Sequence, residues 1–127
     1  MRQHHAAVTC HSSENADRFY TGILGLEKLK TSLLSKELAE ILFDIPMECQ
    51  IILYGNDDVT IEVFITNTRA FDSDPFVHLC LEVEDKTDFA NRCDEAGLIV
   101  KRVSRGDATL IFVKDFDGNL YEIKEIA

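Results

Sequence analysis

The sequence predicts an α+β fold made of two similar halves. Three observations predict it: apolar and polar residues alternate along several short runs, two stretches have helical spacing instead, and the order strand, helix, strand, hairpin occurs twice. A half of about 60 residues buries little core by itself. We therefore expect one domain over residues 1–127, with half-modules 1–67 and 74–127.

The first half begins with a strand and a helix. Residues 4–10 alternate weakly, which predicts a strand. Ser12 or Ser13 can cap the helix that follows, and Gly22 or Gly25 ends it. Apolar residues at helical spacing give this helix one apolar face: Ala16, Phe19, Tyr20 and Ile23.

The middle of the first half holds an extended segment, LEKLK, and an extra helix. In SKELAEILFDIP, Ser35 can cap a short helix, and Pro46 closes the segment. This insertion, residues 35–43, has no counterpart in the second half. An apolar stripe favours packing of the helix against the rest of the protein: Leu38, Ile41 and Leu42.

Hairpins and a second strand and helix complete the pattern. CQIILYG and TIEVFI flank a turn at residues 56–58 and end the first half. The second half opens with a strongly alternating strand at 76–83 and a helix that starts between Asp85 and Thr87 and stops at Gly97. The extended segment LIVKRV and a last hairpin, TLIFVKD and LYEIKEI, follow. The helical spacing is carried by Phe89, Cys93 and Ala96.

Charge and composition exclude several classes of function. The chain has 13 Lys plus Arg against 23 Asp plus Glu, a formal net charge of −10, so its field repels nucleic acid and anionic membrane surfaces. No apolar run approaches the roughly 18–20 residues of a membrane span, and no segment has the pattern of a secretion signal, so we expect a cytoplasmic protein. The cysteines form no CxxC pair and should pack as small hydrophobic residues: Cys10, Cys49, Cys80 and Cys93.

Two histidines and two glutamates occupy equivalent places in the two halves. His5 and His78 belong to the first strands, and Glu62 and Glu122 to the last. Because side chains alternate along a strand, all four fall on the face opposite the aliphatic one. Taken singly, each can be an exposed residue on the solvated face of a sheet. If the halves curl toward each other, the four converge, and their nitrogen and oxygen atoms suit one divalent ion: Zn, Ni, Co, Fe(II) or Mn.

Three motifs resemble the vicinal oxygen chelate superfamily of glyoxalases, bleomycin-resistance proteins and extradiol dioxygenases. They are His5-Ala-Ala-Val followed by the FYxxxLGL segment at residues 19–26, Val77-His78-Leu-Cys-Leu-Glu-Val, and Asp115-Phe-Asp117-Gly118-Asn119-Leu-Tyr-Glu122-Ile. The resemblance covers nearly the whole chain. It implies a glyoxalase-like fold, in which two βαβββ modules form an open barrel-like cup, usually in a homodimer.

The resemblance also implies a site. The family's metal positions correspond to His5, Glu62, His78 and Glu122, a set most like bacterial glyoxalase I, with the metal held within one chain or shared across a dimer. The implied function is that of a lyase or isomerase, which chelates vicinal oxygens of a small substrate and stabilises an enediolate. Glu122 is then the expected base for the α proton, and Glu62 is its rival.

Other functions in the same superfamily stay open. A metal-free protein that sequesters a small molecule, like the bleomycin-resistance members, needs no ligand set. A thiol transferase of the fosfomycin-resistance type or a dioxygenase would use His5, His78 and Glu122 alone, which leaves Glu62 without a role. The insertion at 35–43 either lines the cup or covers the convex face of the sheet. A glutathione substrate needs cationic and amide groups, for which the candidates are Lys30, Arg102, Arg105 and Asn67.

Overall fold

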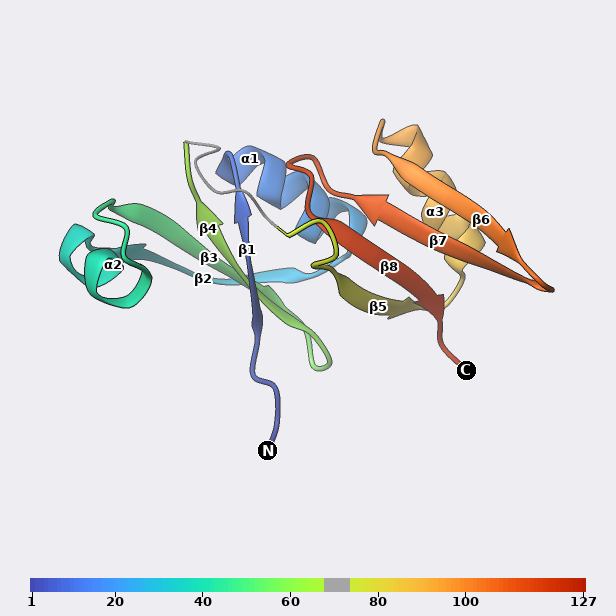
Figure 1. Ribbon diagram of the computed structural model, residues 1–127, viewed down its shortest axis with the longest axis horizontal. Helices are drawn as coiled ribbons and strands as arrows, with labels where there is room; N and C mark the ends of the chain where they lie inside the picture. The colour runs from blue at the N-terminus through green and yellow to red at the C-terminus, as the bar shows by residue number, and fades with distance from the viewer. Residues whose placement is uncertain (68–73) are drawn as a thin grey trace. The chain divides into compact units, whose positions relative to one another are not determined.

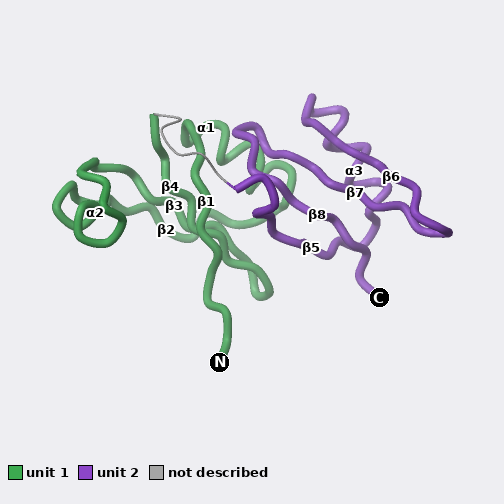
Figure 2. Tube along the Cα trace, in the orientation of Figure 1, with its two compact units in different colours: residues 1–71 green, residues 72–127 purple. Residues whose placement is uncertain are grey.

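The structure is a computed structural model that describes residues 1–67 and 74–127. The chain divides into two compact units, residues 1–71 and residues 72–127 (Figure 2). Each unit consists of a four-stranded sheet with its own helix, and the two units repeat the same order of elements. This confirms the predicted α+β fold of two βαβββ modules.

Unit 1 contains the elements of the repeat and one inserted helix (Figure 1). Its sheet has the order β1-β4-β3-β2, with β1 parallel to β4 and the other neighbours antiparallel. The elements are β1 (Ala6–Cys10), α1 (Ser13–Ala16), the π-helix η1 (Asp17–Ile23), β2 (Glu27–Leu34), α2 (Lys36–Phe43), β3 (Cys49–Gly55) and β4 (Thr60–Ile65).

Unit 2 repeats this topology without the insertion. Its sheet has the order β5-β8-β7-β6, with β5 parallel to β8 and the other neighbours antiparallel. The two sheets are therefore equivalent strand by strand. The elements are β5 (Leu79–Val83), α3 (Lys86–Glu95), β6 (Val100–Arg105), β7 (Ala108–Lys114) and β8 (Leu120–Glu125).

The helices begin and end where the sequence predicts. The Ser12 hydroxyl accepts a hydrogen bond from the Asn15 backbone at 3.1 Å, and α1 continues into η1, which gives way to Gly25 at φ +71°. The Asp85 carboxylate accepts from the Asp88 backbone at 2.9 Å and caps α3. Gly97, at φ +81°, follows that helix. A side-chain cap at the N-terminal end and a left-handed glycine after the C-terminal end thus set the length of each of the two helical segments, α1 with η1 and α3.

One face of the unit 1 sheet forms the core with the first helix. Tyr54 of β3 is fully buried and stacks on Tyr20, with ring centroids 5.3 Å apart. Its hydroxyl donates a hydrogen bond to Asp17 Oδ1 at 2.6 Å, and Lys28 Nζ lies 2.9 Å from the same oxygen. Burial raises the pKa of Asp17, but the hydrogen bonds from Tyr54 and Lys28 outweigh it, so the pKa lies below its usual value. These contacts tie η1 to β2 and β3.

The insertion forms the predicted helix, but its packing differs from the expectation. The Ser35 hydroxyl caps α2 by accepting from the Leu38 backbone at 3.2 Å, and Asp44 ends the helix at φ 59°. The expected packing of the apolar stripe is wrong: Leu38, Ile41 and Leu42 are 46%, 77% and 59% exposed. Ala39 is instead the buried residue of α2.

The unit 2 core has the predicted faces, apart from one strand boundary. Tyr121 and Ile123 of β8 are buried, as is the α3 face made by Phe89, Ala90 and Cys93. The predicted strand at 76–83 begins only at Leu79, because Val77 is exposed and makes a turn contact to Asp74 instead of pairing with β8. None of the helices described in residues 1–67 and 74–127 is long and apolar enough to cross a membrane.

Candidate functional site

In unit 1, the structure brings His5 and Glu62 together. His5 directly precedes β1, and Glu62 is the third residue of β4. Glu62 pairs across the parallel strands with Ala7, two residues after His5, so both side chains belong to the same face. The distance from His5 Nε2 to Glu62 Oε1 is 3.8 Å, and the two side chains are 36% and 27% exposed. They lie opposite the face that packs on the first helix.

In unit 2, His78 and Glu122 occupy the same positions. His78 directly precedes β5, Glu122 is the third residue of β8, and Glu122 pairs with Cys80, two residues after His78. The ring nitrogen Nδ1 of His78 lies 2.8 Å from the Phe76 carbonyl oxygen. A carbonyl oxygen only accepts, so Nδ1 is the donor in this contact, and in a neutral ring Nε2 then offers the lone pair. That is the form in which a histidine binds a metal ion.

The repeat therefore extends from the sequence to the strand register. In both units a histidine stands one position before the first strand, and a glutamate faces the residue two positions after that histidine. The register places each pair on one sheet face, as the alternation predicts. The convergence of all four on a single ion stays a prediction.

Cys80 is a neighbour of the site that the sequence analysis missed. It is exposed, and its thiol donates a hydrogen bond to Glu122 Oε2 at 3.4 Å, so the expectation that every cysteine packs as a small hydrophobic residue is wrong for Cys80. Burial and the hydrogen bond to Glu122 raise the pKa of this thiol, which keeps it protonated. The signal was present in the sequence, because Cys80 follows His78 by two residues on an alternating strand.

One of the candidate residues for a glutathione site, Arg102, lies on the face away from the proposed ligands. Arg102 Nη2 lies 2.6 Å from Asp94 Oδ2 and also donates to Asn91, so this side chain is held by α3 on the helix side of the unit 2 sheet. That face is opposite the one that carries Glu122. Lys30, Arg105 and Asn67 are exposed. Their assignment to a glutathione site stays a prediction.

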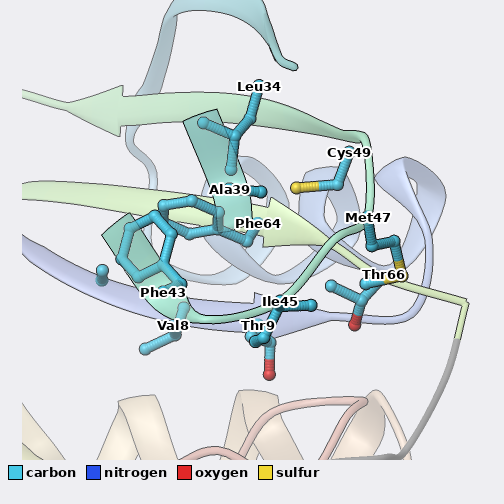
Figure 3. A pocket seen from close by; sticks show the side chains of 11 residues that line it. Val8, Thr9, Leu34, Ala39, Phe43, Ile45, Met47, Cys49, Phe64 and Thr66 are labelled. Atoms are coloured by element: carbon cyan, nitrogen blue, oxygen red, sulfur yellow. The ribbon is translucent and has the colours of Figure 1, made fainter. Parts of the chain in front are cut away.

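An apolar pocket opens on the same sheet face of unit 1, between α2 and the strands (Figure 3). Its volume is about 280 Å³. Phe43 of α2 meets Phe64 of β4 edge to face, with ring centroids 5.5 Å apart. Of the two positions weighed for the insertion, the structure shows the one on the His5 and Glu62 face. The pocket is lined by Ala7, Val8, Thr9, Leu34, Ala39, Phe43, Ile45, Met47, Cys49, Phe64 and Thr66.

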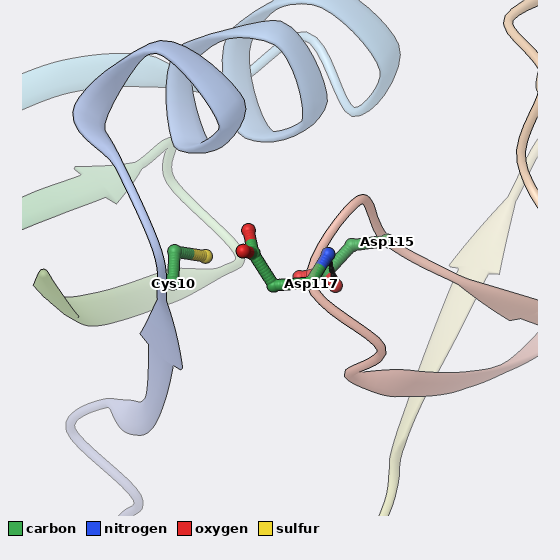
Figure 4. Close-up of side chains that lie close together, drawn as sticks. All are labelled: Cys10, Asp115 and Asp117. Carbon is green, nitrogen blue, oxygen red and sulfur yellow. Dashed lines mark hydrogen bonds between the residues drawn. The ribbon is translucent and has the colours of Figure 1, made fainter. Parts of the chain in front are cut away.

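The DFDGN motif acts through backbone geometry. Asp115 and Asp117, labelled in Figure 4, lie in the turn from β7 to β8. The Asp115 carboxylate accepts hydrogen bonds from the backbones of Asp117 and Asn119, both at 2.9 Å, and from the Asn119 side chain at 2.7 Å. Gly118 adopts φ +91°. The motif thus fixes the turn that leads into β8 and so sets the position of Glu122.

The fold and the repeated pairs define a class of two-module proteins, and comparisons identify the family. The chain matches the Glyoxalase/Bleomycin resistance protein/Dioxygenase superfamily over residues 2–123, and it belongs to that family. A search of curated proteins found no match.

Solved structures share the fold at low sequence identity. A glyoxalase family protein from Bacillus cereus has a TM-score of 0.76 at 16% identity, covering 98% of this chain and 93% of that one. The fosfomycin resistance protein FosX from Listeria monocytogenes has a TM-score of 0.74 at 12% identity, covering 100% and 94%. Another structure of FosX from Listeria monocytogenes contains Mn(II) and a sulfate ion. The trypanothione-dependent glyoxalase I of Leishmania major has a TM-score of 0.69 at 17% identity, covering 98% and 87%.

Proposed function

We propose that this protein is a metal-dependent enzyme that binds two neighbouring oxygen atoms of a small substrate and catalyses a lyase or isomerase reaction of the glyoxalase type. The proposal rests on the repeated pair of His5 with Glu62 and His78 with Glu122, each at the same strand register. The recurrence of both residue types at equivalent positions of two sheets supports a shared role better than four unrelated exposed residues would. Family membership supports the same reading.

The chemistry of these side chains fits a divalent ion. Two imidazoles and two carboxylates are ligands that Zn, Ni, Co, Fe(II) and Mn accept. His78 offers Nε2 because Nδ1 is engaged by the Phe76 carbonyl. Ligand atoms about 2.1 Å from one ion lie about 3–4 Å apart, and the 3.8 Å between His5 Nε2 and Glu62 Oε1 falls in that range. Both pairs would therefore serve as ligands without a change of register.

The carboxylates would move the proton. A divalent ion in this set would supply Lewis acidity toward the two substrate oxygens. Glu122 is held on the open face by the Cys80 thiol, and Lys124 Nζ lies 3.9 Å from its Oε2. Its side chain is 20% exposed, so a substrate can reach it. We assign Glu122 as the base that takes the proton from the carbon beside those oxygens and, with the assistance of Glu62, returns it to the neighbouring carbon.

Metal binding is the first test, on protein prepared without a chelator. Elemental analysis should find one divalent ion per site, and calorimetry with Ni, Co, Zn and Mn should show Glu62→Gln and Glu122→Gln each weakening binding at least tenfold. Glu82→Gln is the matched control, since Glu82 is an exposed carboxylate of β5 outside the proposed set, and it should bind as wild type does. Protein without metal, whose Tm does not rise with any of the four ions, would refute the proposal and favour the metal-free binding function.

Turnover is the second test. Metal-loaded protein should convert the hemithioacetal of methylglyoxal and glutathione to a thioester, and Glu122→Gln should abolish the reaction. If no metal supports turnover, this hemithioacetal is not the substrate, and the assignment to the family still holds. If Glu62→Gln leaves metal affinity intact while Glu122→Gln lowers it, the ligands are His5, His78 and Glu122 alone. That result would favour a thiol transferase or a dioxygenase.

We further propose a homodimer, and complementation tests whether it shares the site. One variant lacks the unit 1 pair (His5→Ala with Glu62→Gln), and the other lacks the unit 2 pair (His78→Ala with Glu122→Gln). Neither should bind metal alone. If ligands come from two copies, refolding the variants together restores metal binding in the mixed dimer, whereas a site within one chain is not restored.

A further inference from the structure

We propose that the pocket beneath α2 binds an uncharged alkyl or aryl group, and that this group is the apolar part of the substrate whose oxygens are bound beside His5 and Glu62. The second half of this statement rests on the proposed function. The first half rests on the pocket alone and is tested without metal.

The pocket and the His5–Glu62 pair lie on one continuous surface. Phe64 lines the pocket two residues beyond Glu62 on β4, and Ala7 lines it two residues beyond His5. Two residues of a strand span about 7 Å, and residues two apart share a face. A molecule of drug-like size therefore reaches from the pocket to the pair without leaving the sheet.

The lining sets the chemical class of the ligand. All eleven lining side chains are uncharged, and the exposed wall is almost entirely carbon and sulfur (Figure 3). An apolar cavity of roughly 150 Å³ holds benzene, so about 280 Å³ accepts an aromatic ring with several further carbons. A charged group buried in this pocket would meet no side chain of opposite charge, so its burial would be unfavourable. The charged glutathione moiety is thus excluded from this pocket, whereas an alkyl or aryl group is favoured by roughly 25 cal/mol per Å² that it buries.

The insertion builds the wall that creates this selectivity. Ala39 is 2% exposed and presents only a methyl group toward the strands, which leaves the space open. Phe43 closes one side against Phe64. In unit 2, β6 ends at Arg105 and β7 begins at Ala108, so the described part of that unit has no equivalent wall. The pocket is therefore a feature of unit 1, where the inserted segment forms one of its walls.

Hydroxamic acids test the link to the candidate metal site, because they chelate through two neighbouring oxygens and carry a variable tail. We compare acetohydroxamic with benzohydroxamic acid on metal-loaded protein by calorimetry, after correcting for their affinities for the free ion. The phenyl compound should bind at least tenfold tighter, about 1.4 kcal/mol. Ala39→Phe should bring the ratio close to one without changing acetohydroxamate binding. Ile41→Phe, which adds a ring on the exposed side of α2, should keep the wild-type ratio.

Met47→Trp fills the pocket from the loop after α2 and replaces Ala39→Phe if that variant does not fold. A ratio near one in wild type overturns the link between pocket and metal. So does an unchanged ratio in a folded, pocket-filling variant, because the phenyl group then binds elsewhere.

Thiol protection tests the pocket in metal-free protein. Cys49 lines the pocket and is half-buried, whereas Cys80 is exposed in the other unit and serves as the internal reference. Benzyl alcohol should slow alkylation of Cys49 by iodoacetamide at least threefold, measured by mass spectrometry of the peptides, and leave Cys80 unchanged. Equal slowing or none overturns the pocket. Protection of Cys49 in a protein that binds no metal upholds the pocket while rejecting the proposed function, so the two failures are distinguishable.

Discussion

Replacing Tyr54 with phenylalanine removes one hydroxyl and leaves the packing unchanged. The ring still stacks on Tyr20, and no cavity is created. What disappears is the 2.6 Å hydrogen bond to Asp17. A hydrogen bond to a charged group contributes about 1.5–3 kcal/mol. The Asp17 side chain is 44% exposed, so water replaces part of the interaction, and we expect a loss of about 1 kcal/mol, or a fall in Tm of about 4 °C.

Urea unfolding of Tyr54→Phe, Asp17→Asn and the double variant checks this value, because the coupling between the two positions isolates the bond. The folded-state pKa of Asp17 is lowered, so its contribution is present above its usual pKa near 3.8 and is lost as the pH falls through the lowered value. The gap between wild type and Tyr54→Phe should therefore narrow below about pH 4. Equal stability at pH 7, or the same loss from Tyr54→Phe with and without Asp17, would refute the reasoning.

Two further predictions concern backbone geometry in unit 2, both measured as urea midpoints. Gly97 has φ +81° and open space where an added methyl group would lie, so Gly97→Ala should cost about 1 kcal/mol through backbone strain alone, and Gly97→Asn should cost less; equal stability of the alanine variant would exclude strain. Asp115→Ala leaves three donors of the turn without their acceptor and should cost about 2–3 kcal/mol, whereas Asp115→Asn keeps one acceptor oxygen and should lose less. An alanine variant as stable as the asparagine variant would show that these bonds do not hold the turn.

Local patterns in the sequence account for most of the fold. The caps at Ser12 and Asp85, the glycines at 25 and 97, and the alternation along β4 and β8 are short-range signals, and each is found where predicted. The same alternation predicts that His5 and Glu62 share a face, because only the parity of a residue in its strand is needed. The parity of a residue within its strand does not show which residues of distant strands belong together. The repeat of the same pattern in both halves indicated that each His pairs with the Glu of its own half.

Other features depend on contacts between distant segments and were not predicted. An apolar stripe shows that a helix has two faces, but not which face meets a neighbour, and so the orientation of α2 was missed. The π-helical bonds of η1, such as Leu24 to Phe19, are not encoded in apolar spacing. The apolar residues on either side of Cys80 in the sequence predict a packed thiol, whereas its neighbour in space is Glu122.

The described part of unit 2 has no helix equivalent to α2, so the two copies of the module differ in what they contribute to the proposed site. Each unit retains a His and a Glu at the shared register, so the duplicated part of the sequence carries the proposed reaction. The insertion carries selectivity, and it lies in one unit only, between β2 and β3. Exchanging that single segment would therefore change which substrates fit the pocket and leave all four proposed metal-binding residues in place. The insertion is thus the segment in which relatives of this chain can differ in specificity without losing the proposed reaction.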